Sequence, residues 1–444
     1  MAGWRFRADT GNQPASLRVV ALTAVLGAIL TACGSGSAAH SPAVPGRSDP
    51  LLPSALPRGT VVTSGTRAWE QPLGAQVTNS VQIQHTATAY QVAAATTDGS
   101  GYRIVTGRLA DGAILGAFDA PIDATWPVFA DVGGSLLSFA ALGGSDTAAN
   151  RVVALLPDGQ QVWSVSAPSL GASDESALVV DFATSDRVVV RANPLLRNPY
   201  RYAPMWVLDA ATGAVVWSIT EGAIPRWADV ADGLIMYAAS STGDTDGPSD
   251  QVVVRDLATG TVTTTFDLVD ESLPPHVLCG GILSRDRVVA CGFQGATERV
   301  GTAVLAAADG RVVAEYGLRA PPVLDRGAQV VALPLVSRAI QAIDAQAGDP
   351  LWELSANQVE QGDITIKHAR AGHFIGDAGN TNIVLHASSG VLELAEVFYF
   401  IPDGQAPLGA ALAVLDSHIV GFQGQEVAVG TARDNPADVL FIRN

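Results

Sequence analysis

The sequence predicts an all-β protein built as a β-propeller of four-stranded antiparallel blades. Three observations support this prediction: one hairpin pattern recurs seven times, the repeats are spaced 38 to 54 residues apart, and further β-rich segments lie between the hairpins. About four short strands in every 40 to 50 residues are typical of propeller blades. Two packed β-sandwiches would also contain short strands and turns, but they would not require a regular period.

Each repeat consists of a short apolar strand, a small polar turn that ends in glycine, and a second apolar strand. The seven segments are Tyr102–Phe118, Val152–Val165, Met205–Ile219, Gln251–Phe266, Thr302–Tyr316, Ala339–Leu354 and Asn382–Val397. Their turns end at Gly112, Gly159, Gly213, Gly260, Gly310, Gly348 and Gly390. Glycine permits the positive φ that tight hairpin turns need, so these residues mark one turn in each blade.

Further strand pairs complete the blades. Ala177–Asp181 is expected to pair with Arg187–Ala192, and Leu278–Leu283 with Arg287–Gly292. Residues 58–444, which number 387, correspond to about eight blades, with seven as the alternative. The eighth blade would combine Leu408–Phe422, Glu426–Ala432 and Val439–Arg443 with an N-terminal strand near Thr60–Trp69. Joining both ends of the chain in one sheet would close the ring and remove open sheet edges.

The N-terminus has the pattern of an export signal. Arg5, Arg7 and Arg18 form a basic segment, and the apolar run from Val19 to Leu30 has 12 residues, too few to span a membrane. Leu30-Thr31-Ala32-Cys33 resembles the lipobox of bacterial lipoproteins at all four positions. We therefore expect residues 1–32 to be a signal peptide and Cys33 to carry lipid on the extracytoplasmic side of the cell membrane. The alternative is an ordinary secretory signal that contains a cysteine.

Residues 33–57 are rich in Gly, Ser, Ala and Pro and are expected to form a flexible tether between Cys33 and the propeller at 58–444. The two other cysteines, Cys279 and Cys291, fall nearly opposite each other if Leu278–Gly292 folds as a hairpin. An oxidising compartment favours a structural disulfide between them. Two buried free thiols on adjacent strands are the alternative.

The net charge excludes one class of function. The formal charge is −17, and removal of residues 1–32, which carry three Arg and one Asp, leaves −17 − 2 = −19. Lys367 is the only lysine. A chain this acidic is a poor ligand for the phosphate backbone, so we expect no nucleic-acid partner.

Three hairpins keep a tryptophan four residues after the turn glycine: Trp163, Trp217 and Trp352. The segment from Leu208 to Trp217 reads Leu-Asp-Ala-Ala-Thr-Gly-Ala-Val-Val-Trp, and it resembles the Asp-x-x-Thr-Gly-x-x-x-Trp signature of pyrroloquinoline-quinone (PQQ)-like propellers. The resemblance implies that these tryptophans lie on outer strands and dock one blade against the next. The other repeats carry Gly116, Thr264, Ala314 and Leu394 at this position.

The PQQ-like family contains two kinds of protein. Its quinoprotein dehydrogenases use PQQ and a metal, and they resemble one another in an adjacent pair of cysteines against the cofactor and an Asp base. Here no two cysteines are adjacent. Other members are lipid-anchored and lack a cofactor, such as the scaffold lipoprotein of the barrel-assembly machine, which binds proteins. The lipobox and degenerate repeats resemble this second group, and they imply a scaffold without a cofactor.

Catalytic candidates are few. Lys367 is not part of a Ser-x-x-Lys motif, which serine–lysine catalysis would need. Gly99-Ser100-Gly101 is expected to be a turn and not a nucleophile elbow. Metal ligands would have to come from His368, His373 and His386, or from Asp244, Asp246 and Asp250 in a Gly-rich loop. Their spacing matches no metal motif, so hydrogen-bonded histidines and a solvated acidic loop are preferred. We predict no catalytic or metal site; a cofactor- or metal-dependent propeller enzyme is the alternative.

Four long loops offer a better candidate site. They are Gly143–Asn150, Asn193–Tyr202, Ser240–Asp250 and Gln294–Gly301. Each is expected between the second and third strands of a blade, on the face shared with the blade-to-blade connections. Residues of types enriched at binding hot spots occur here: Trp126, Arg197, Tyr200, Arg201, Tyr202, Arg226 and Trp227. We expect this face to bind an envelope protein or polymer.

Overall fold

The computed structural model describes most of the chain between residues 66 and 440. The described ranges are 66–86, 88–121, 126–143, 150–172, 177–193, 204–219, 228–239, 251–267, 276–294, 300–307, 309–355, 364–370, 372–378, 381–390, 392–396, 410–415, 418–423, 429–432 and 435–440. The expected signal peptide, Cys33 and the expected tether lie outside these residues.

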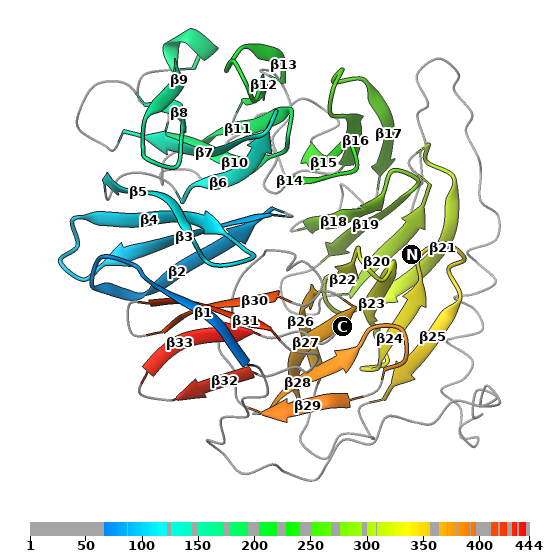
Figure 1. Ribbon diagram of the computed structural model, residues 1–444. Coiled ribbons are helices and arrows are strands. Elements are labelled where there is room, and N and C mark those ends of the chain that lie inside the picture. Colours follow the sequence, from blue (N-terminus) through cyan, green and yellow to red (C-terminus); the bar gives the residue numbers. More distant parts are fainter. Residues whose placement is uncertain are drawn as a thin grey trace, which may run out of the picture.

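The described strands form eight antiparallel sheets that follow one another around a ring in chain order (Figure 1). Seven sheets have four strands, and one has five strands drawn from both ends of the chain. Within the described ranges, the only helical segment is the short 3-10 helix η1 (Pro168–Leu170), and no helix is long and apolar enough to cross a membrane. The prediction of an all-β propeller is therefore confirmed, with eight sheets in the ring.

We number the sheets as blades 1 to 8. Blade 1 comprises β2 (Val77–His85), β3 (Ala89–Thr96), β4 (Gly101–Arg108) and β5 (Ile114–Pro121). Blade 2 comprises β6 (Val128–Val132), β7 (Ser135–Leu142), β8 (Arg151–Leu155) and β9 (Gln161–Ser166). Blade 3 comprises β10 (Ala177–Ala183), β11 (Arg187–Asn193), β12 (Met205–Asp209) and β13 (Val215–Ile219). Blade 4 comprises β14 (Ala228–Ala231), β15 (Leu234–Ala239), β16 (Gln251–Asp256) and β17 (Val262–Asp267).

The second half of the ring is built in the same way. Blade 5 comprises β18 (His276–Ser284), β19 (Arg287–Gln294), β20 (Val300–Ala306) and β21 (Val312–Leu318). Blade 6 comprises β22 (Val323–Asp325), β23 (Val330–Pro334), β24 (Ile340–Asp344) and β25 (Pro350–Leu354). Blade 7 comprises β26 (Ile364–Arg370), β27 (His373–Ala378), β28 (Thr381–His386) and β29 (Leu392–Glu396). Blade 8 comprises β1 (Thr66–Pro72), β30 (Ala410–Leu415), β31 (His418–Gln423), β32 (Val429–Ala432) and β33 (Asn435–Leu440).

Each of blades 1 to 7 is a simple meander. Its strands pair in chain order, the first strand lies toward the centre of the ring, and the fourth lies at the rim (Figure 1). The seven predicted hairpins are the third and fourth strands of these blades. All seven turn glycines have positive φ, from 68° at Gly390 to 89° at Gly310, as the turn geometry requires.

The hydrophobic core consists of layers between neighbouring blades. One layer joins blades 2 and 3, with Phe139 and Trp206 almost fully buried within it. Further layers join blades 3 and 4, 4 and 5, 5 and 6, and 6 and 7. The middle strands are therefore buried on both sides, and all six residues of β15 are buried. This explains the continuous runs of valine and alanine in the sequence, because alternation is expected only where one face meets water.

Both ends of the chain meet in blade 8. Its strand order is β1-β31-β30-β33-β32, and β1 pairs with β31 in antiparallel register from Thr66↔Gln423 to Pro72↔His418. The predicted segments at both termini thus supply strands of one sheet. The blade has five strands and not the predicted four, because the predicted segment Leu408–Phe422 forms two antiparallel strands, β30 and β31. The last two strands, β32 and β33, pair with each other, and β33 joins β30 through Ala413↔Val439.

Tryptophans on one blade dock onto the hairpin turn of the next. The indole Nε1 of Trp163 donates to the carbonyl of Ala210 at 2.9 Å, that of Trp217 to Leu257 at 2.8 Å, and that of Trp352 to Ala387 at 2.7 Å. Each ring also covers the following turn glycine: a Cβ added at Gly213, Gly260 or Gly390 would lie 2.7–2.8 Å from indole atoms. These glycines are therefore required both by their φ angle and by the indole.

A fourth tryptophan, Trp69 on β1, docks in the same way at the ring closure. Its Nε1 donates to the carbonyl of Leu109 at 3.0 Å, and its ring stacks on Tyr90 with centroids 5.3 Å apart. A Cβ at Gly112 of blade 1 would lie 2.3 Å from the indole, and one at Gly421 of blade 8 would lie 2.2 Å from it. Trp69 is thus held between two glycines, one on each of the blades that it joins.

In two of the four repeats that lack the tryptophan, an aromatic residue two positions later contacts the next blade. Tyr316 donates its hydroxyl to the carbonyl of Gly348 at 2.7 Å, and Phe118 lies against Gly159, whose added Cβ would be 2.8 Å from Phe118 Cβ. In both cases the aromatic residue is six residues after the turn glycine of its own hairpin. Side chains two apart on a strand share a face, so either position reaches the neighbouring blade.

We predict that Trp69→Ala lowers the free energy of unfolding by about 3 kcal/mol, because it removes a large ring from the junction that closes the propeller. Trp69→Phe should cost only about 1 kcal/mol, since it keeps a ring on Tyr90 and loses one hydrogen bond. Urea denaturation followed by tryptophan fluorescence and circular dichroism measures both. Equal losses in the two variants would contradict a packing role for the ring.

Candidate functional site

The face that carries the second-to-third-strand loops and the blade connections is called here the long-loop face. The four predicted long loops follow β7, β11, β15 and β19, so they belong to blades 2 to 5. By the strand bounds, the connections of blades 2, 3 and 4 are long, at residues 143–150, 194–204 and 240–250. The connections of blades 1, 5, 6 and 7 are short, at residues 97–100, 295–299, 335–339 and 379–380, so the predicted loop Gln294–Gly301 of blade 5 is no longer than the loop of blade 6. The long loops therefore occupy one sector of the ring. Arg197, Tyr200, Arg201, Tyr202, Arg226 and Trp227 lie outside the described residues.

Trp126 is the described member of the predicted binding face, and it lies at the seam between blades 1 and 2. Its ring centroid is 4.5 Å from that of Tyr102, and Trp126 packs against the buried cluster of Ala93, Ile104 and Ala120. The chain next to it is tied down by Gln84, whose amide donates to the carbonyl of Pro127 and accepts from the amide of Phe129, both at 2.8 Å. Trp126 is half-buried, so it helps to join the two blades and leaves part of its ring accessible.

The opposite face, called here the short-turn face, is shaped by aspartates that cap the hairpin turns. Asp209 Oδ1 accepts from the backbone amide of Thr212 at 2.9 Å and from its hydroxyl at 2.8 Å. Asp256 makes the equivalent bonds to Thr259 at 2.9 and 3.0 Å. The Asp-x-x-Thr-Gly part of the repeat is therefore a turn-forming device, because the carboxylate and hydroxyl satisfy backbone donors that the turn leaves unpaired.

These bonds favour the ionised carboxylates. The Thr212 hydroxyl, together with the amides of Thr212 and Ala211 and the charge of Arg187, holds the pKa of Asp209 below its ordinary value. Burial raises the pKa of Asp256, but the hydrogen bonds from Thr259 and the charge of Arg285 outweigh it and lower that pKa overall. The turn aspartates are thus structural groups that are ionised at neutral pH.

Near the centre of the ring, a polar cluster ties three consecutive blades together. Arg326, which follows β22 of blade 6, forms an ion pair with Asp229 on β14 of blade 4. Between them runs β18 of blade 5, where the amide of Ile282 donates to Asp229 at 2.7 Å and its carbonyl accepts from Arg326 Nε at 2.7 Å. Gly281 makes room for this contact, since a Cβ there would lie 2.9 Å from Leu324 and 3.2 Å from Asp229 Oδ2.

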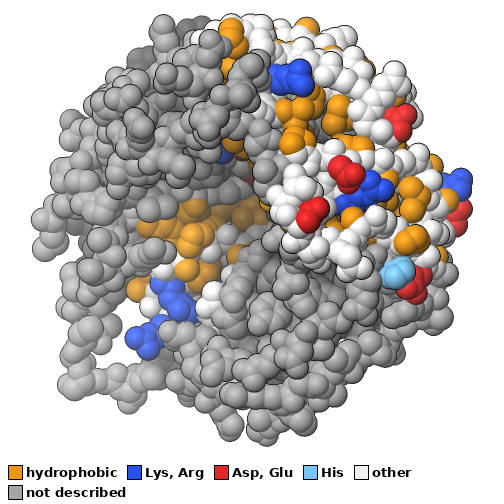
Figure 2. Space-filling view, turned by 90° about the vertical axis from the view of Figure 1, so that its left-hand side faces the viewer, with side chains coloured by type: hydrophobic (Ala, Val, Ile, Leu, Met, Phe, Trp, Pro, Cys, Tyr) orange, Lys and Arg blue, Asp and Glu red, His pale blue; other side chains and the backbone are white. Residues whose placement is uncertain are grey.

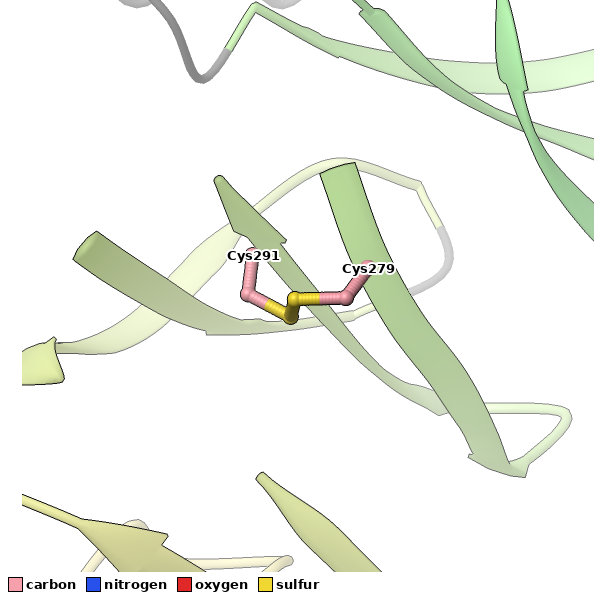
Figure 3. Close-up of a disulfide and its surroundings, with 2 residues drawn as sticks. All are labelled: Cys279 and Cys291. Carbon is pink, nitrogen blue, oxygen red and sulfur yellow. A yellow bond between two sulfur atoms is a disulfide. The ribbon is translucent and has the colours of Figure 1, made fainter. Parts of the chain in front are cut away.

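The two remaining cysteines form a disulfide in the same blade (Figure 3). Cys279 on β18 is directly opposite Cys291 on β19, with Cα atoms 4.9 Å apart. Cys291 is fully buried beside Val289 and Phe293. The bond fixes the pairing of β18 next to Gly280 and Gly281, where the strand lacks side chains that could hold the register.

The cofactor arrangement of the quinoprotein enzymes does not fit these residues. It needs an adjacent pair of cysteines facing the cofactor, whereas Cys279 and Cys291 join two strands within blade 5. Two of the histidines considered as metal ligands, His373 and His386, are paired across β27 and β28 with ring centroids 5.4 Å apart. The side chain of His368 and the residues Asp244, Asp246 and Asp250 lie outside the described part, in which no group of three or more candidate ligands occurs.

Two ion pairs lie within blade 1. Arg103 and Asp119 are 3.1 Å apart on β4 and β5, and Arg108 and Asp111 are 2.9 Å apart at the next turn. Figure 2 shows acidic and basic side chains next to each other on the described surface of this side, with hydrophobic side chains between them. Exposed pairs of this kind contribute little to stability.

A comparison with protein families bears on the middle of the repeat array. The family model for PQQ-like repeats described as outer membrane protein assembly factor BamB matches residues 148–339, which extend from blade 2 into blade 6. The chain is a β-propeller of PQQ-like repeats that resembles BamB. No curated protein matches the chain in sequence.

Solved structures with similar folds belong to several functional classes. BamB from Moraxella catarrhalis is 15% identical with a TM-score of 0.47, and the match covers 82% of this chain and 98% of that one. A europium-containing methanol dehydrogenase is 11% identical with a TM-score of 0.46 and coverages of 77% and 82%. Sqt1 from Saccharomyces cerevisiae is 8% identical with a TM-score of 0.45 and coverages of 82% and 100%. These likenesses concern the fold and assign no function to this chain.

We predict that Asp209→Asn lowers the melting temperature at neutral pH by on the order of 1 °C, the small effect expected for an exposed turn. Because the pKa of Asp209 is lowered by folding, its stabilisation is present above the ordinary value of 3.8 and is lost as the pH falls through the lower folded value. The difference between wild type and variant should therefore shrink between pH 6 and pH 3.

Differential scanning calorimetry at both pH values measures this difference. Thr212→Val serves as the matched variant, because it keeps the carboxylate and removes the hydroxyl donor. It should raise the pKa of Asp209 toward its ordinary value. A difference between wild type and Asp209→Asn that is the same at both pH values would show that the carboxylate charge has no part in it.

Proposed function

We propose that this protein is a membrane-anchored, extracytoplasmic scaffold that binds an envelope protein or envelope polymer without catalysis. The observation that carries the proposal is the match of residues 148–339 to BamB, which is described as an outer membrane protein assembly factor. An assembly factor acts through contacts with other proteins. The ring of blades supports the same role here, since it brings the strand ends that carry these loops to one face of the molecule.

The lipid anchor is part of the proposal. Cys33 follows Leu30-Thr31-Ala32 and a 12-residue apolar run, the arrangement in which a lipoprotein cysteine receives its lipid. Each buried methylene contributes about 0.8 kcal/mol, so more than one acyl chain is needed for a stable anchor. The segment 33–57 then gives the propeller reach away from the membrane surface.

The binding surface is assigned to the long-loop face over blades 2 to 5. Function tends to reside on loops that a rigid scaffold positions, and within this sector the second-to-third-strand loops of blades 2 to 4 are the longest. The residues proposed to contact the partner are Trp126, Arg197, Tyr200, Arg201, Tyr202, Arg226 and Trp227. Arg, Tyr and Trp combine large contact area with polar groups, which is why they dominate binding hot spots.

We predict that Cys33→Ser moves the protein from the membrane fraction to the soluble fraction of the envelope, because the serine cannot receive the lipid. Cell fractionation with immunoblotting measures the distribution, and mass spectrometry of the N-terminal peptide detects the missing acyl groups. The lipidation hypothesis is wrong if the variant stays in membranes with an N-terminus identical in mass to the unmodified peptide.

A second prediction concerns the loop between β11 and β12. The combined variant Arg197→Ala, Tyr200→Ala, Arg201→Ala and Tyr202→Ala should reduce recovery of the crosslinked partner about tenfold or more, while the fold is retained. Crosslinking in the native envelope followed by quantitative mass spectrometry measures recovery. The control variant Arg108→Ala with Arg311→Ala changes exposed residues of the short-turn face and should leave recovery unchanged.

Undiminished recovery from the loop variant would refute the assignment of this face. The scaffold role itself has a separate test. Absorbance of a bound quinone in the purified protein, or a tightly held metal found by elemental analysis, would support the cofactor-dependent enzyme instead.

A further inference from the structure

The outer strands of the blades differ in whether they contain a residue that prevents pairing with another strand. The fourth strand of each of blades 1 to 7 is the outer edge of its sheet, and open edges attract other strands unless charge, proline or a similar device blocks them. Five of these seven strands contain a charged residue or a proline: β5, β17, β21, β25 and β29. Only β9 and β13 contain neither.

The two unblocked strands lie on neighbouring blades and expose aliphatic side chains. Val162 on β9 is 45% exposed, and Val215 and Val216 on β13 are 46% and 39% exposed. Trp217 on β13 is only half-buried, whereas the equivalent Trp352 is 2% exposed. Exposed valine also occurs on β17 and β21, but those strands carry Asp267 and Glu315. Blades 4 and 5 therefore provide an internal control.

Charges beside these edges indicate what kind of strand would pair with them. Asp158 and Asp209 lie at the hairpin turns that lead into β9 and β13, and Asp186 lies at the turn between β10 and β11 of the same blade as β13. The basic side chain of Arg187 is already close to Asp186 and Asp209, at 3.5 and 3.9 Å. The turn end of this sector is therefore acidic, and the whole chain carries −17. Two copies of such a chain repel each other, whereas basic residues on a partner would be attracted.

We propose that the outer edges of β9 and β13 are docking sites for an extended segment of a partner protein. The segment pairs with one of these edge strands and adds a further β-strand to the sheet of that blade. The segment alternates apolar and polar residues and carries Lys or Arg next to the apolar stretch. Backbone hydrogen bonds supply affinity in this mode, and the exposed valines and Trp217 select the apolar side chains. The inference rests on the proposed scaffold function and adds a second contact, at the rim, to the one on the long-loop face.

The test uses the full-length chain and a defined probe, a fluorescent peptide of alternating Thr and Val flanked by lysines at both ends. Fluorescence anisotropy should show saturable binding to the wild type. The variant Val162→Lys with Val215→Lys places charge on both edges and should weaken binding about tenfold or more. The matched control, Val262→Lys with Val312→Lys, alters two equally exposed valines on β17 and β21 and should bind like the wild type.

Two further measurements locate the contact. The same peptide flanked by glutamates should bind more weakly than the lysine peptide, with a difference that decreases in high salt. Hydrogen–deuterium exchange with the lysine peptide bound should show new protection in Gln161–Ser166 and Val215–Ile219. Binding that is equal in both valine variants, or no saturable binding at all, would overturn the docking site.

The occupant is tested separately. A concentration-dependent dimer in analytical ultracentrifugation that is lost in Val162→Lys with Val215→Lys, but kept in the control, would show that a second copy occupies the edge and would overturn the partner proposal. Failure here is distinguishable from failure of the scaffold function. Crosslinking that depends on the loop between β11 and β12 would persist if only the rim site is wrong, and would be lost if the scaffold function is wrong.

Discussion

The contact between an aromatic side chain of one blade and the turn glycine of the next is the interaction on which this ring depends. A single blade buries little alone, because its middle strands are apolar on both faces and need neighbours. The aromatic contact sets how those neighbours meet. In four junctions an indole donates to the carbonyl beside the turn, and its ring lies where a Cβ would otherwise be. The same pair of residues therefore both positions one blade against the next and buries apolar surface between them.

The sequence is sufficient to predict the part of this interaction that recurs at a fixed spacing. The turn glycines and three of the tryptophans can be recognised from the repeat. A turn with positive φ requires glycine and the docking contact uses tryptophan, so each feature is marked by one residue type at a fixed position. Trp69 has no such signal, since it precedes the first hairpin and acquires its neighbours only when β1 pairs with β31. Tyr316 and Phe118 could have been found by asking which residues share a strand face with the missing tryptophan.

The pairing of Cys279 with Cys291 could be predicted from the sequence because the two residues flank one local turn. The Asp229–Arg326 pair could not, because its members lie 97 residues apart on blades that are not adjacent, and no motif links them. The glycines beside this ion pair, Gly280 and Gly281, do not reveal it either, because in the sequence they resemble an ordinary flexible strand. The structure explains these glycines, because the ion pair of Asp229 and Arg326 needs space beside β18. The disulfide then fixes the strand register that glycines, which lack side chains, specify weakly.

Two unrelated features of the surface converge on the same sector of the ring. The second-to-third-strand loops are longest in blades 3 and 4 and also long in blade 2, whereas the unblocked sheet edges belong to blades 2 and 3. Neither feature is needed for closure, since blades 1, 6 and 7 pack with short loops and blades 5 to 7 with charged outer strands. A fold that repeats one unit has no structural reason to vary it on one side only. The variation is what a partner bound to that side would require.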